Sequence, residues 1–279
     1  MFRYKTLYGL SQKGIAKMRI SQRGREEILA AVAKRLAVAK RVFVLTGAGL
    51  GVASGLGTFR GPDGYWRNHS FEQLASLDGF HADPALVWTW YNERIATYLA
   101  AAPNDGHHAL SALQELVPHL TVATQNVDGL HARAGSRNLQ ELHGSIFDVK
   151  CTGRCVPRGT PIERLSEPFE LARLQHDGCG GMRRPGVVWF GESLPQQALL
   201  EAQRESRQAD VVLVAGTSAQ VEPAASLAQK YRSEMMVVEI NPEPALRHRT
   251  PWVLAEGTET GLPAIVLALR HRKSSSSGL

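Results

Sequence analysis

The sequence predicts an α/β protein built on a doubly wound, parallel, Rossmann-like sheet, with a smaller domain that contains helices and binds a metal. Short apolar runs alternate along the chain with stretches of helical periodicity, which is the pattern of a parallel sheet covered by helices. Each apolar run is followed at once by glycine or polar residues, as at the carboxyl ends of strands where ligands bind. The three cysteines of the chain all lie in one irregular segment, residues 151–184, which indicates a small insertion held by a metal.

The first elements of this fold are a helix and a strand. Residues 26–40 are rich in alanine, and Ile28, Val32 and Leu36 recur at helical spacing, so an amphipathic helix is expected there. The apolar run at residues 41–46 then breaks into glycine, which indicates a strand followed by a tight turn.

The remaining elements follow the same logic. Residues 71–99 have a helical pattern and several aromatic side chains, and we expect them to belong to the smaller domain. Three further apolar runs are expected to be strands, at residues 120–124, 210–215 and 235–240. A helix over residues 262–269 is expected to end the domain.

The predicted organisation has three parts. Residues 1–25 carry seven Lys or Arg residues and no acid, so they are expected to form a basic extension. Residues 26–270 are expected to form the folded domain, and the serine-rich residues 271–279 a disordered tail. Within the domain, the part with the parallel sheet is expected at about 26–70, 104–145 and 186–270, and the smaller domain at about 71–103 and 146–185.

Bulk composition excludes several classes of function. The chain has 279 residues, of which 43% are hydrophobic and 21% charged, as in an ordinary globular protein, and no apolar run is long enough to span a bilayer. The net charge of +6 is concentrated in residues 1–25, so neither nucleic acid nor membrane is inferred as a partner. Three cysteines are too few for a secreted disulfide framework. We expect a monomer in the cytoplasm, with mitochondria as the alternative because a basic, acid-poor start is also typical of a presequence.

A glycine-rich turn follows the first expected strand. Gly47, Gly49 and Gly51 stand close together, but Val52 follows, so the Gly-x-Gly-x-x-Gly fingerprint of dinucleotide-dependent dehydrogenases is not present. Such a turn still lets backbone N–H groups approach a pyrophosphate. The alternative is a tight turn with a purely structural role.

Three segments and one histidine together carry a family resemblance. The turn at residues 47–51 is followed by Ser-Gly-Leu-Gly-Thr-Phe-Arg at 54–60, by Thr-Gln-Asn-Val-Asp-Gly-Leu-His at 124–131, and then by His143 within Gln-Glu-Leu-His-Gly. In this order they resemble the sirtuins, a family of NAD-dependent protein-lysine deacylases, over about residues 42–266. The resemblance implies NAD as co-substrate and acylated lysine side chains of proteins as partners.

The resemblance also implies which residues hold NAD. They lie in the glycine turn, in the loop that follows it and at the ends of later strands: Gly47, Ala48, Gly49, Gly51, Thr58, Phe59, Arg60, Trp66, Gln125, Asn126, Val127, Asp128, Gly216, Thr217, Ser218, Asn241 and Pro242. Two positions depart from the family pattern, since Gly51 stands where the family usually has Ser, and Gly57 where it usually has Pro. The first change removes a hydroxyl close to the dinucleotide. The second is expected to loosen the loop, because glycine loses more backbone entropy on ordering.

His143 occupies the position of the family's catalytic histidine. A neutral imidazole accepts protons near neutral pH, which suits a general base. By the resemblance, the acyl oxygen of the substrate lysine attacks C1′ of the nicotinamide ribose, and His143 then deprotonates a ribose hydroxyl. The products would be free lysine, nicotinamide and O-acyl-ADP-ribose. Two alternatives stay open: a protein mono-ADP-ribosyltransferase and a non-catalytic NAD-binding module.

The resemblance places a structural zinc in the segment that contains the cysteines. In the family two cysteine pairs hold the metal, and here Cys151 and Cys155 form the first pair while Cys179 is the last ligand. His176 stands where the third cysteine is expected, and a Cys₃His site is chemically suitable for zinc. The alternative is that the metal has been lost and the cysteines are ordinary residues.

A segment after the metal site is expected to contact the substrate. Residues 186–192 resemble the family segment that pairs with the substrate peptide as an added strand, so Val188, Phe190 and Gly191 are expected to lie close to the peptide. The alternative is an ordinary strand that is buried in the core.

The acyl group itself is expected to meet Tyr91 and Arg94. Together with Ala75, sixteen residues before Tyr91, they resemble the sirtuin subgroup that removes succinyl, malonyl and glutaryl groups. The two side chains are three residues apart on an expected helix, hence on one face, and a guanidinium with a hydroxyl suits a carboxylate. The sequence therefore predicts a deacylase of both acetyl and acidic acyl groups. The alternative is that Tyr91 packs in the core and that Arg94 is solvated.

Overall fold

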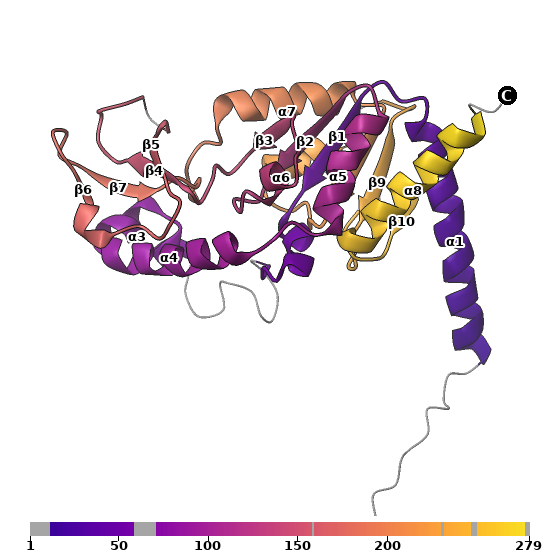
Figure 1. Cartoon of the computed structure of the whole chain (residues 1–279), viewed down its shortest axis with the longest axis horizontal. Coiled ribbons are helices and arrows are strands. Elements are labelled where there is room, and N and C mark those ends of the chain that lie inside the picture. The colour runs from indigo at the N-terminus through magenta and orange to yellow at the C-terminus, as the bar shows by residue number, and fades with distance from the viewer. Residues whose placement is uncertain (1–11, 59–70, 158, 230–231, 247–249, 277–279) are drawn as a thin grey trace, which may run out of the picture.

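A parallel six-stranded sheet forms the larger lobe of the molecule (Figure 1). The computed structural model describes residues 12–58, 71–157, 159–229, 232–246 and 250–276. The strand order is β10-β9-β8-β1-β2-β3, and every neighbouring pair in this sheet runs parallel. The strands are β1 (Val42–Thr46), β2 (Leu120–Thr124), β3 (Leu139–Glu141), β8 (Val211–Ala215), β9 (Met236–Ile240) and β10 (Trp252–Leu254).

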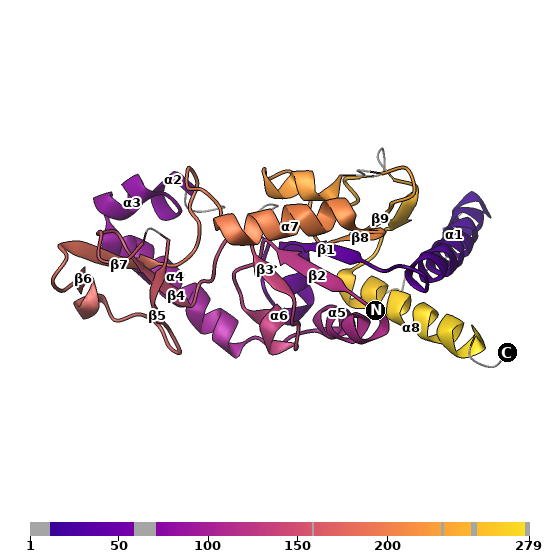
Figure 2. The same ribbon diagram turned by 90° about the horizontal axis from the view of Figure 1, so that it is seen from above.

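Helices cover both faces of this sheet, as a doubly wound fold requires (Figure 2). They are α1 (Gln12–Leu36), α5 (Asp105–Leu116), α7 (Gln196–Gln208), α8 (Thr258–Ser276) and the short 3-10 helix η4 (Ala224–Ala228). Successive side chains of a strand point to opposite faces, so β1 contributes to two cores. Val42 and Val44 pack with α1, α5 and α8, whereas Phe43 and Leu45 pack with α7 and η4.

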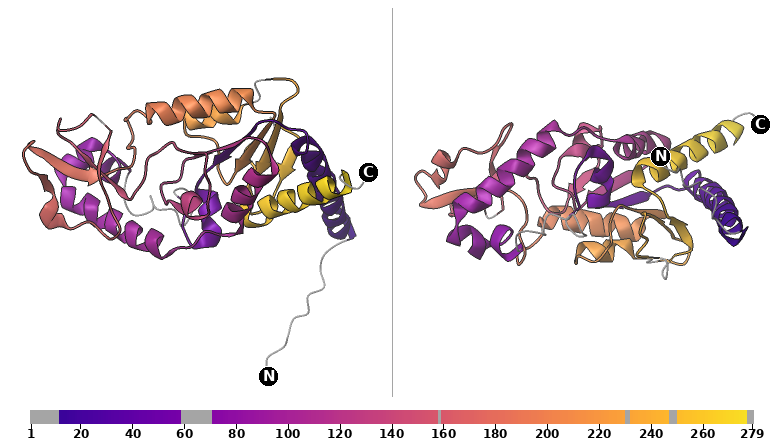
Figure 3. Two further views of the ribbon diagram at one scale, coloured as in Figure 1. Left: turned by 45° about the horizontal axis from the view of Figure 1, so that its top comes forward. Right: turned by 90° about the horizontal axis from the view of Figure 1, so that it is seen from below.

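A smaller lobe lies at one end of the molecule in both views of Figure 3. Its four strands, ordered β5-β4-β7-β6, are antiparallel. An apolar core that includes Phe80, Trp88, Val149 and Trp189 joins this sheet to three helices. The elements are α2 (Phe71–Leu74), α3 (Leu77–Ala82), α4 (Pro84–Ala100), β4 (Asp148–Cys151), β5 (Pro161–Arg164), β6 (Gln175–His176) and β7 (Gly181–Pro185). The predicted fold class, a doubly wound parallel sheet with a smaller second domain, is confirmed.

The central strands agree closely with the sequence prediction. The bounds of β2 are those expected, and β1, β8 and β9 each begin one residue later. The outer strands β3 and β10 are absent from the prediction, because three residues are too few to show a periodicity. The helical stretch predicted at residues 71–99 is three helices. Ser76 and Asp83 separate them as N-caps, whose side chains accept the N–H groups of Gly79 and Leu86.

Both terminal helices are longer than predicted. Helix α1 reaches back into the predicted basic extension, whose residues 12–25 are helical. Helix α8 extends to Ser276, so residues 271–276 are helical where a disordered tail was predicted. The hydroxyls of Ser274 and Ser275 donate to carbonyl oxygens one turn earlier, at 3.0 and 2.9 Å, so these serines are compatible with the helix. Among the helices of the described ranges, none combines the length and apolar character that a membrane crossing requires.

Candidate active site

The loops after β1 and β8 meet backbone to backbone at the carboxyl edge of the large sheet. A Cβ atom on Gly47 would lie 2.6 Å from Cβ of Thr217, and one on Gly49 would lie 2.8 Å from Cα of Gly216. Gly216 has a φ of 63°, and a Cβ there would lie 2.5 Å from the nitrogen of Leu50. Only glycine fits these three positions. The chain places β2 on one side of β1 and β8 on the other, and such a switch point is where doubly wound sheets bind ligands.

Polar side chains after β2 and β9 tie these loops together. Gln125 donates from Nε2 to Oγ1 of Thr217 at 2.9 Å, and Asn126 donates from Nδ2 to the carbonyl oxygen of Gly47 at 3.0 Å. Asn241, which follows β9, donates from Nδ2 to the carbonyl oxygen of Thr217 at 3.2 Å. The residues predicted at the ends of four separate strands are therefore joined by hydrogen bonds into one polar edge.

Asp128 is buried beside this edge. Its Oδ1 accepts the N–H of Leu130 at 2.8 Å. Burial raises the pKa of this carboxyl, although that hydrogen bond and the charge of Arg133 act in the opposite direction. Val127 is also buried, and its carbonyl oxygen accepts the N–H of Ile146 at 3.0 Å. Backbone hydrogen bonds thus hold this segment in place before any ligand arrives.

The imidazole of His143 is half-buried at the same edge and has a defined tautomer. Its Nδ1 lies 2.9 Å from the carbonyl oxygen of Gln125. A carbonyl oxygen can only accept, so the hydrogen is on Nδ1 and the lone pair of Nε2 is left to accept a proton. Burial lowers the pKa of His143, although the hydrogen bond to Gln125 acts to raise it. The imidazole is therefore neutral at neutral pH, the state that a general base needs.

Asn104 belongs to the site, although its place in the sequence does not indicate this. Its Nδ2 donates to the carbonyl oxygen of Leu50 at 2.8 Å and to Oγ of Ser54 at 2.9 Å. It thereby holds the 3-10 helix η1 (Ala48–Ser54), with which the predicted cofactor loop begins. Its Oδ1 also accepts the N–H of Gly106 and caps α5. An Asn before an apolar helix indicates an N-cap, but that pattern does not show what else the side chain reaches.

Two further histidines are buried beneath the loops. Nε2 of His131 lies 2.9 Å from Oγ1 of Thr46, and Nδ1 of His107 accepts the N–H of Asn104 at 3.3 Å. The two imidazole rings stand edge to face, with centroids 5.1 Å apart. Burial lowers the pKa of His107 to about 4 and that of His131 to about 3, so both rings are neutral in the folded protein at neutral pH.

We expect these two histidines to make the folded state less stable in mild acid. In the unfolded chain histidine takes up a proton near pH 6.5, whereas the folded protein keeps His107 and His131 neutral down to about pH 4 and about pH 3. Below pH 6.5 the unfolded state therefore binds more protons. The stability due to neutral burial is complete above that pH and declines as the pH falls toward the folded values. In this range each histidine adds about 1.4 kcal/mol per pH unit to the slope of the free energy of unfolding against pH.

Urea unfolding at a series of pH values between about 7.5 and 5 measures this slope. In the His107→Gln variant this slope is expected to be smaller by the amount that corresponds to one bound proton. The same slope in the variant and in the wild type would contradict the assignment of His107.

Four metal-ligating side chains converge in the smaller lobe: Cys151, Cys155, His176 and Cys179. Nδ1 of His176 lies between 3.2 and 3.3 Å from the three sulfurs, and the sulfurs of Cys151 and Cys179 are 3.5 Å apart. All four donor atoms lie within 4.8 Å of one another. A tetrahedral zinc with bonds of about 2.0–2.3 Å needs donor atoms roughly 3.5 Å apart. The donor set and its spacing therefore fit the predicted structural zinc, with His176 as the third ligand.

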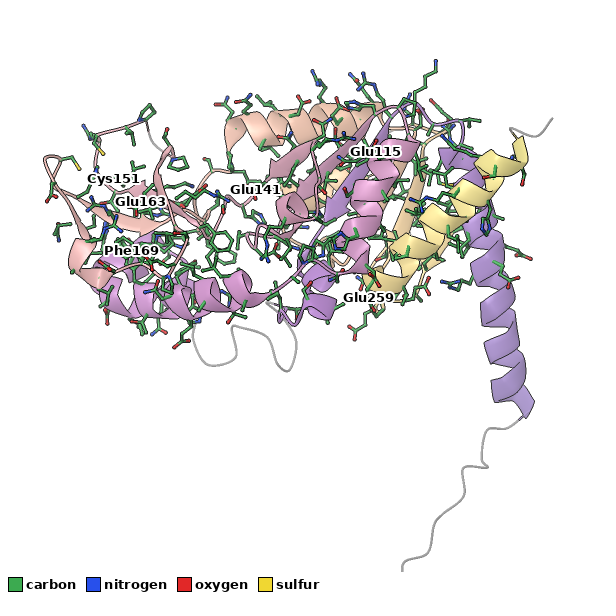
Figure 4. The ribbon with its side chains drawn as sticks, in the orientation of Figure 1. Glu115, Glu141, Cys151, Glu163, Phe169 and Glu259 are labelled. Carbon is green, nitrogen blue, oxygen red and sulfur yellow. The ribbon has the colours of Figure 1, made fainter. Side chains whose placement is uncertain are left out.

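The position of this cluster suits a structural rather than a catalytic metal. Figure 4 shows Cys151 toward the outer end of the smaller lobe, apart from Glu141, which precedes His143 by two residues. Gly181 packs directly against the cluster, since a Cβ there would lie 2.7 Å from the sulfur of Cys151. A metal at this place would join β4, which contains Cys151, to β6, which contains His176, and to the loop before β7, which contains Cys179.

The expected substrate segment, residues 186–192, links the two lobes. The N–H of Val188 donates to the carbonyl oxygen of His143 at 2.8 Å, and the N–H of Phe190 donates to the carbonyl oxygen of Ala75 at 3.0 Å. All seven residues are described, and they form no strand. The side chain of Phe190 is 49% exposed, so the alternative of a buried core strand does not hold.

Tyr91 and Arg94 lie on one face of α4, and both are buried. The hydroxyl of Tyr91 accepts the Nε1–H of Trp189 at 3.0 Å, and Nη2 of Arg94 donates to the hydroxyl of Tyr98 at 2.6 Å. The guanidinium carbon of Arg94 lies 4.3 Å from the centroid of the Trp90 ring. Burial raises the pKa of Tyr91 to about 12, so its hydroxyl keeps its proton at neutral pH. Arg94 is thus not a solvated surface residue.

Part of the predicted cofactor site lies outside the described residues, namely Phe59, Arg60 and Trp66. Ser218 and Pro242 are exposed. Gly51 is buried in η1, where a Cβ would lie 3.3 Å from Cβ of Leu56. A serine at this position therefore requires a small shift of Leu56, so the departure from the family pattern has a packing consequence here.

Comparison with known proteins agrees with this geometry. The sequence model of the Sir2 family matches residues 47–223. An NAD-dependent protein deacylase of Aquifex aeolicus is 42% identical over 236 residues, which is 84% of this chain and 97% of that protein. A crystal structure of a Sir2 homologue in complex with NAD is 40% identical, with a TM-score of 0.78 over 88% of this chain and 94% of the other. A structure of a Sir2 protein bound to a myristoylated histone peptide is 28% identical, with a TM-score of 0.67 over 90% and 99% of the two chains.

The family match spans more than half of the chain, and the Aquifex relative is covered almost completely. A homologue of the same fold binds NAD, and the glycine-lined switch point with its polar edge is compatible with that cofactor. The chain therefore belongs to the Sir2 family, the sirtuins, and is an NAD-dependent protein deacylase.

Proposed function

We propose that this deacylase removes succinyl and malonyl groups, as well as acetyl groups, from the lysine side chains of proteins. The observation that carries the proposal is the buried pair of Tyr91 and Arg94 beside the substrate segment. A carboxylate that enters a protein interior is costly to desolvate unless a cation and hydrogen-bond donors meet it. Arg94 supplies the cation, and Tyr91, which keeps its proton, supplies a neutral donor.

His143 is proposed as the general base of this reaction. It accepts a proton at Nε2, while its Nδ1–H stays bonded to the carbonyl oxygen of Gln125 and fixes the orientation of the ring. The cofactor would be held by the glycine turn and by Gln125, Asn126, Asp128 and Asn241. When bound, NAD supplies the ribose to which the acyl group is transferred, so that nicotinamide and O-acyl-ADP-ribose are the products.

The protein substrate is proposed to bind along residues 186–192. Support comes from the exposed side chain of Phe190 and from the position of this segment between the carbonyl oxygens of His143 and Ala75. Incubation of the enzyme with NAD and a succinylated peptide, followed by mass spectrometry, tests the reaction. O-succinyl-ADP-ribose is the expected product, whereas ADP-ribose attached to protein would indicate a transferase instead.

The Tyr91→Phe, Arg94→Met double variant is expected to lower the succinyl-to-acetyl ratio of kcat/KM by about ten- to a hundredfold. A charge-assisted hydrogen bond contributes roughly 1.5–3 kcal/mol, and acetyl-lysine has no carboxylate to use it. Matched acetyl and succinyl peptides provide the measurement. If both residues only pack in the core, the two activities fall together with the melting temperature. Equal losses on the two peptides would leave a generic deacylase.

A further inference from the structure

An ion pair between buried Arg184 and half-buried Glu192 holds the part of the substrate segment that carries Trp189. Arg184, near the end of β7, is 5% exposed, and both of its terminal nitrogens reach the carboxylate of Glu192. The same guanidinium donates to the carbonyl oxygens of Pro185 at 3.1 Å and Val187 at 2.8 Å. The guanidinium of Arg184 thus joins the start of the substrate segment to its end at Glu192. The carboxylate of Glu192 compensates the charge of the buried guanidinium.

Trp189 is fixed by this pair on two sides. Its backbone N–H donates to Oε2 of Glu192 at 2.8 Å, and the guanidinium carbon of Arg184 lies 3.5 Å from the centroid of its ring. Burial alone acts to raise the pKa of Glu192, but the hydrogen bond and the charge of Arg184 outweigh it, and the net shift is downward. The pair therefore stays ionised at neutral pH, and the indole keeps one orientation in the core.

The indole of Trp189 in turn bonds the hydroxyl of Tyr91, with Nε1 and Oη 3.0 Å apart. An indole nitrogen can only donate, so the contact uses a lone pair of the hydroxyl oxygen. The hydroxyl hydrogen must then point elsewhere. Among the described residues it has no acceptor, so it can donate to an acceptor on the substrate. A carboxylate at the end of an acyl chain is such an acceptor, whereas the methyl group of acetyl-lysine is not.

We propose that Trp189 is a positioning residue for acidic acyl groups: held by Arg184 and Glu192, it presents the hydroxyl of Tyr91 as a donor to the acyl carboxylate. The inference rests on the acidic-acyl function proposed for Tyr91 and Arg94. It adds a residue that acts through Tyr91. Tyr91 and Arg94 are on α4, whereas Trp189 is in the substrate segment. Selectivity between acyl groups thereby depends also on the conformation of that segment.

Trp189→Phe tests this role, because phenylalanine keeps an aromatic ring against Arg184 and removes the indole N–H. The succinyl-to-acetyl ratio of kcat/KM is expected to fall about tenfold, chiefly through a higher KM for the succinyl peptide. Trp88→Phe is the matched control. Trp88 is buried in the same core, and its indole donates to the carbonyl oxygen of Arg183 at 2.9 Å. This control is expected to lower the melting temperature comparably and to leave the ratio as in the wild type.

A double-mutant cycle separates the positioning role from packing. Once Tyr91→Phe has removed the hydroxyl, the further change Trp189→Phe is expected to leave the ratio unchanged, because the two residues act through one hydrogen bond. Independent, multiplicative effects of the two changes would overturn the role. So would equal losses on both peptides in Trp189→Phe, because that outcome is the signature of packing alone.

The Tyr91→Phe, Arg94→Met variant, measured in parallel, distinguishes this inference from the function on which it rests. If that variant lowers the ratio and Trp189→Phe does not, the positioning role is overturned and the acidic-acyl pocket stands. If neither variant changes the ratio, or if the wild type does not act on the succinyl peptide, both proposals are overturned.

Discussion

Replacement of His143 by alanine is expected to lower kcat for deacylation by about 10²–10⁴-fold, the usual loss when a general base is removed. The fold is expected to survive, because the side chain is half-buried and, within the described residues, hydrogen-bonds only to the carbonyl oxygen of Gln125. Steady-state turnover on an acetyl peptide measures the loss. Because burial lowers the pKa of His143, the acid limb of the wild-type rate profile is expected below pH 6.5, the ordinary value for histidine.

His108→Ala is a suitable control for this experiment, because His108 is an exposed histidine on α5. It is expected to turn over like the wild type. Thermal stabilisation by NAD shows whether the His143→Ala variant still binds the cofactor, which separates a lost base from a lost site. Near-normal turnover of that variant would remove His143 from the catalytic role.

Removal of zinc is expected to unfold the smaller lobe. The purified protein should contain about one zinc per chain, and a strong chelator or the variant Cys179→Ser should lower the melting temperature markedly. A structural zinc contributes roughly 10–16 kcal/mol of apparent binding free energy in small domains, which is as large as the stability of a typical domain. The four ligands lie in β4, in β6 and in the loops beside them, so loss of the metal removes the cross-link between these short strands.

The histidine ligand offers a conservative control. His176→Cys converts the cluster to four thiolates, which also suit tetrahedral zinc, so it is expected to retain the metal, whereas His176→Ala is expected to lose it. Metal analysis and thermal unfolding provide the two readouts. Substoichiometric zinc in the wild type, together with no effect of chelator, would show that the cluster is not a metal site.

Much of the fold could be predicted because the central strands are buried on both faces. Strands β1, β2 and β8 appear in the sequence as runs of apolar residues and threonine without charged residues, and every one of their residues is buried. The edge strands β3 and β10 have three residues each and no such signal. Helices α1 and α8 are also longer than the sequence predicts. A polar or serine-rich stretch gives little helical signal of its own, and it extends a helix only when local hydrogen bonds and the packing of the remaining turns support it.

The candidate site could be predicted in part, for a similar reason. The side chains that follow a strand directly, such as Gln125, Asn126 and Asn241, were identified because the end of a strand determines where they lie. The roles of Asn104, His131 and Trp189 could not be identified, because their partners Leu50, Thr46 and Tyr91 are distant in sequence. Nothing near Trp189 in the chain indicates that its indole meets a hydroxyl 98 positions away.

The sequence by itself determined the family, the parallel sheet and the four residues of the Cys₃His cluster, since each depends on short runs of residues with characteristic spacing. Only the tertiary structure decided the tautomer of His143, the burial of Arg94 and the link from Arg184 through Trp189 to Tyr91. These properties depend on which groups from separate elements come within about 3 Å of each other. Local sequence patterns show periodicity but do not show such contacts. The contacts form only when separate elements pack together in the folded protein.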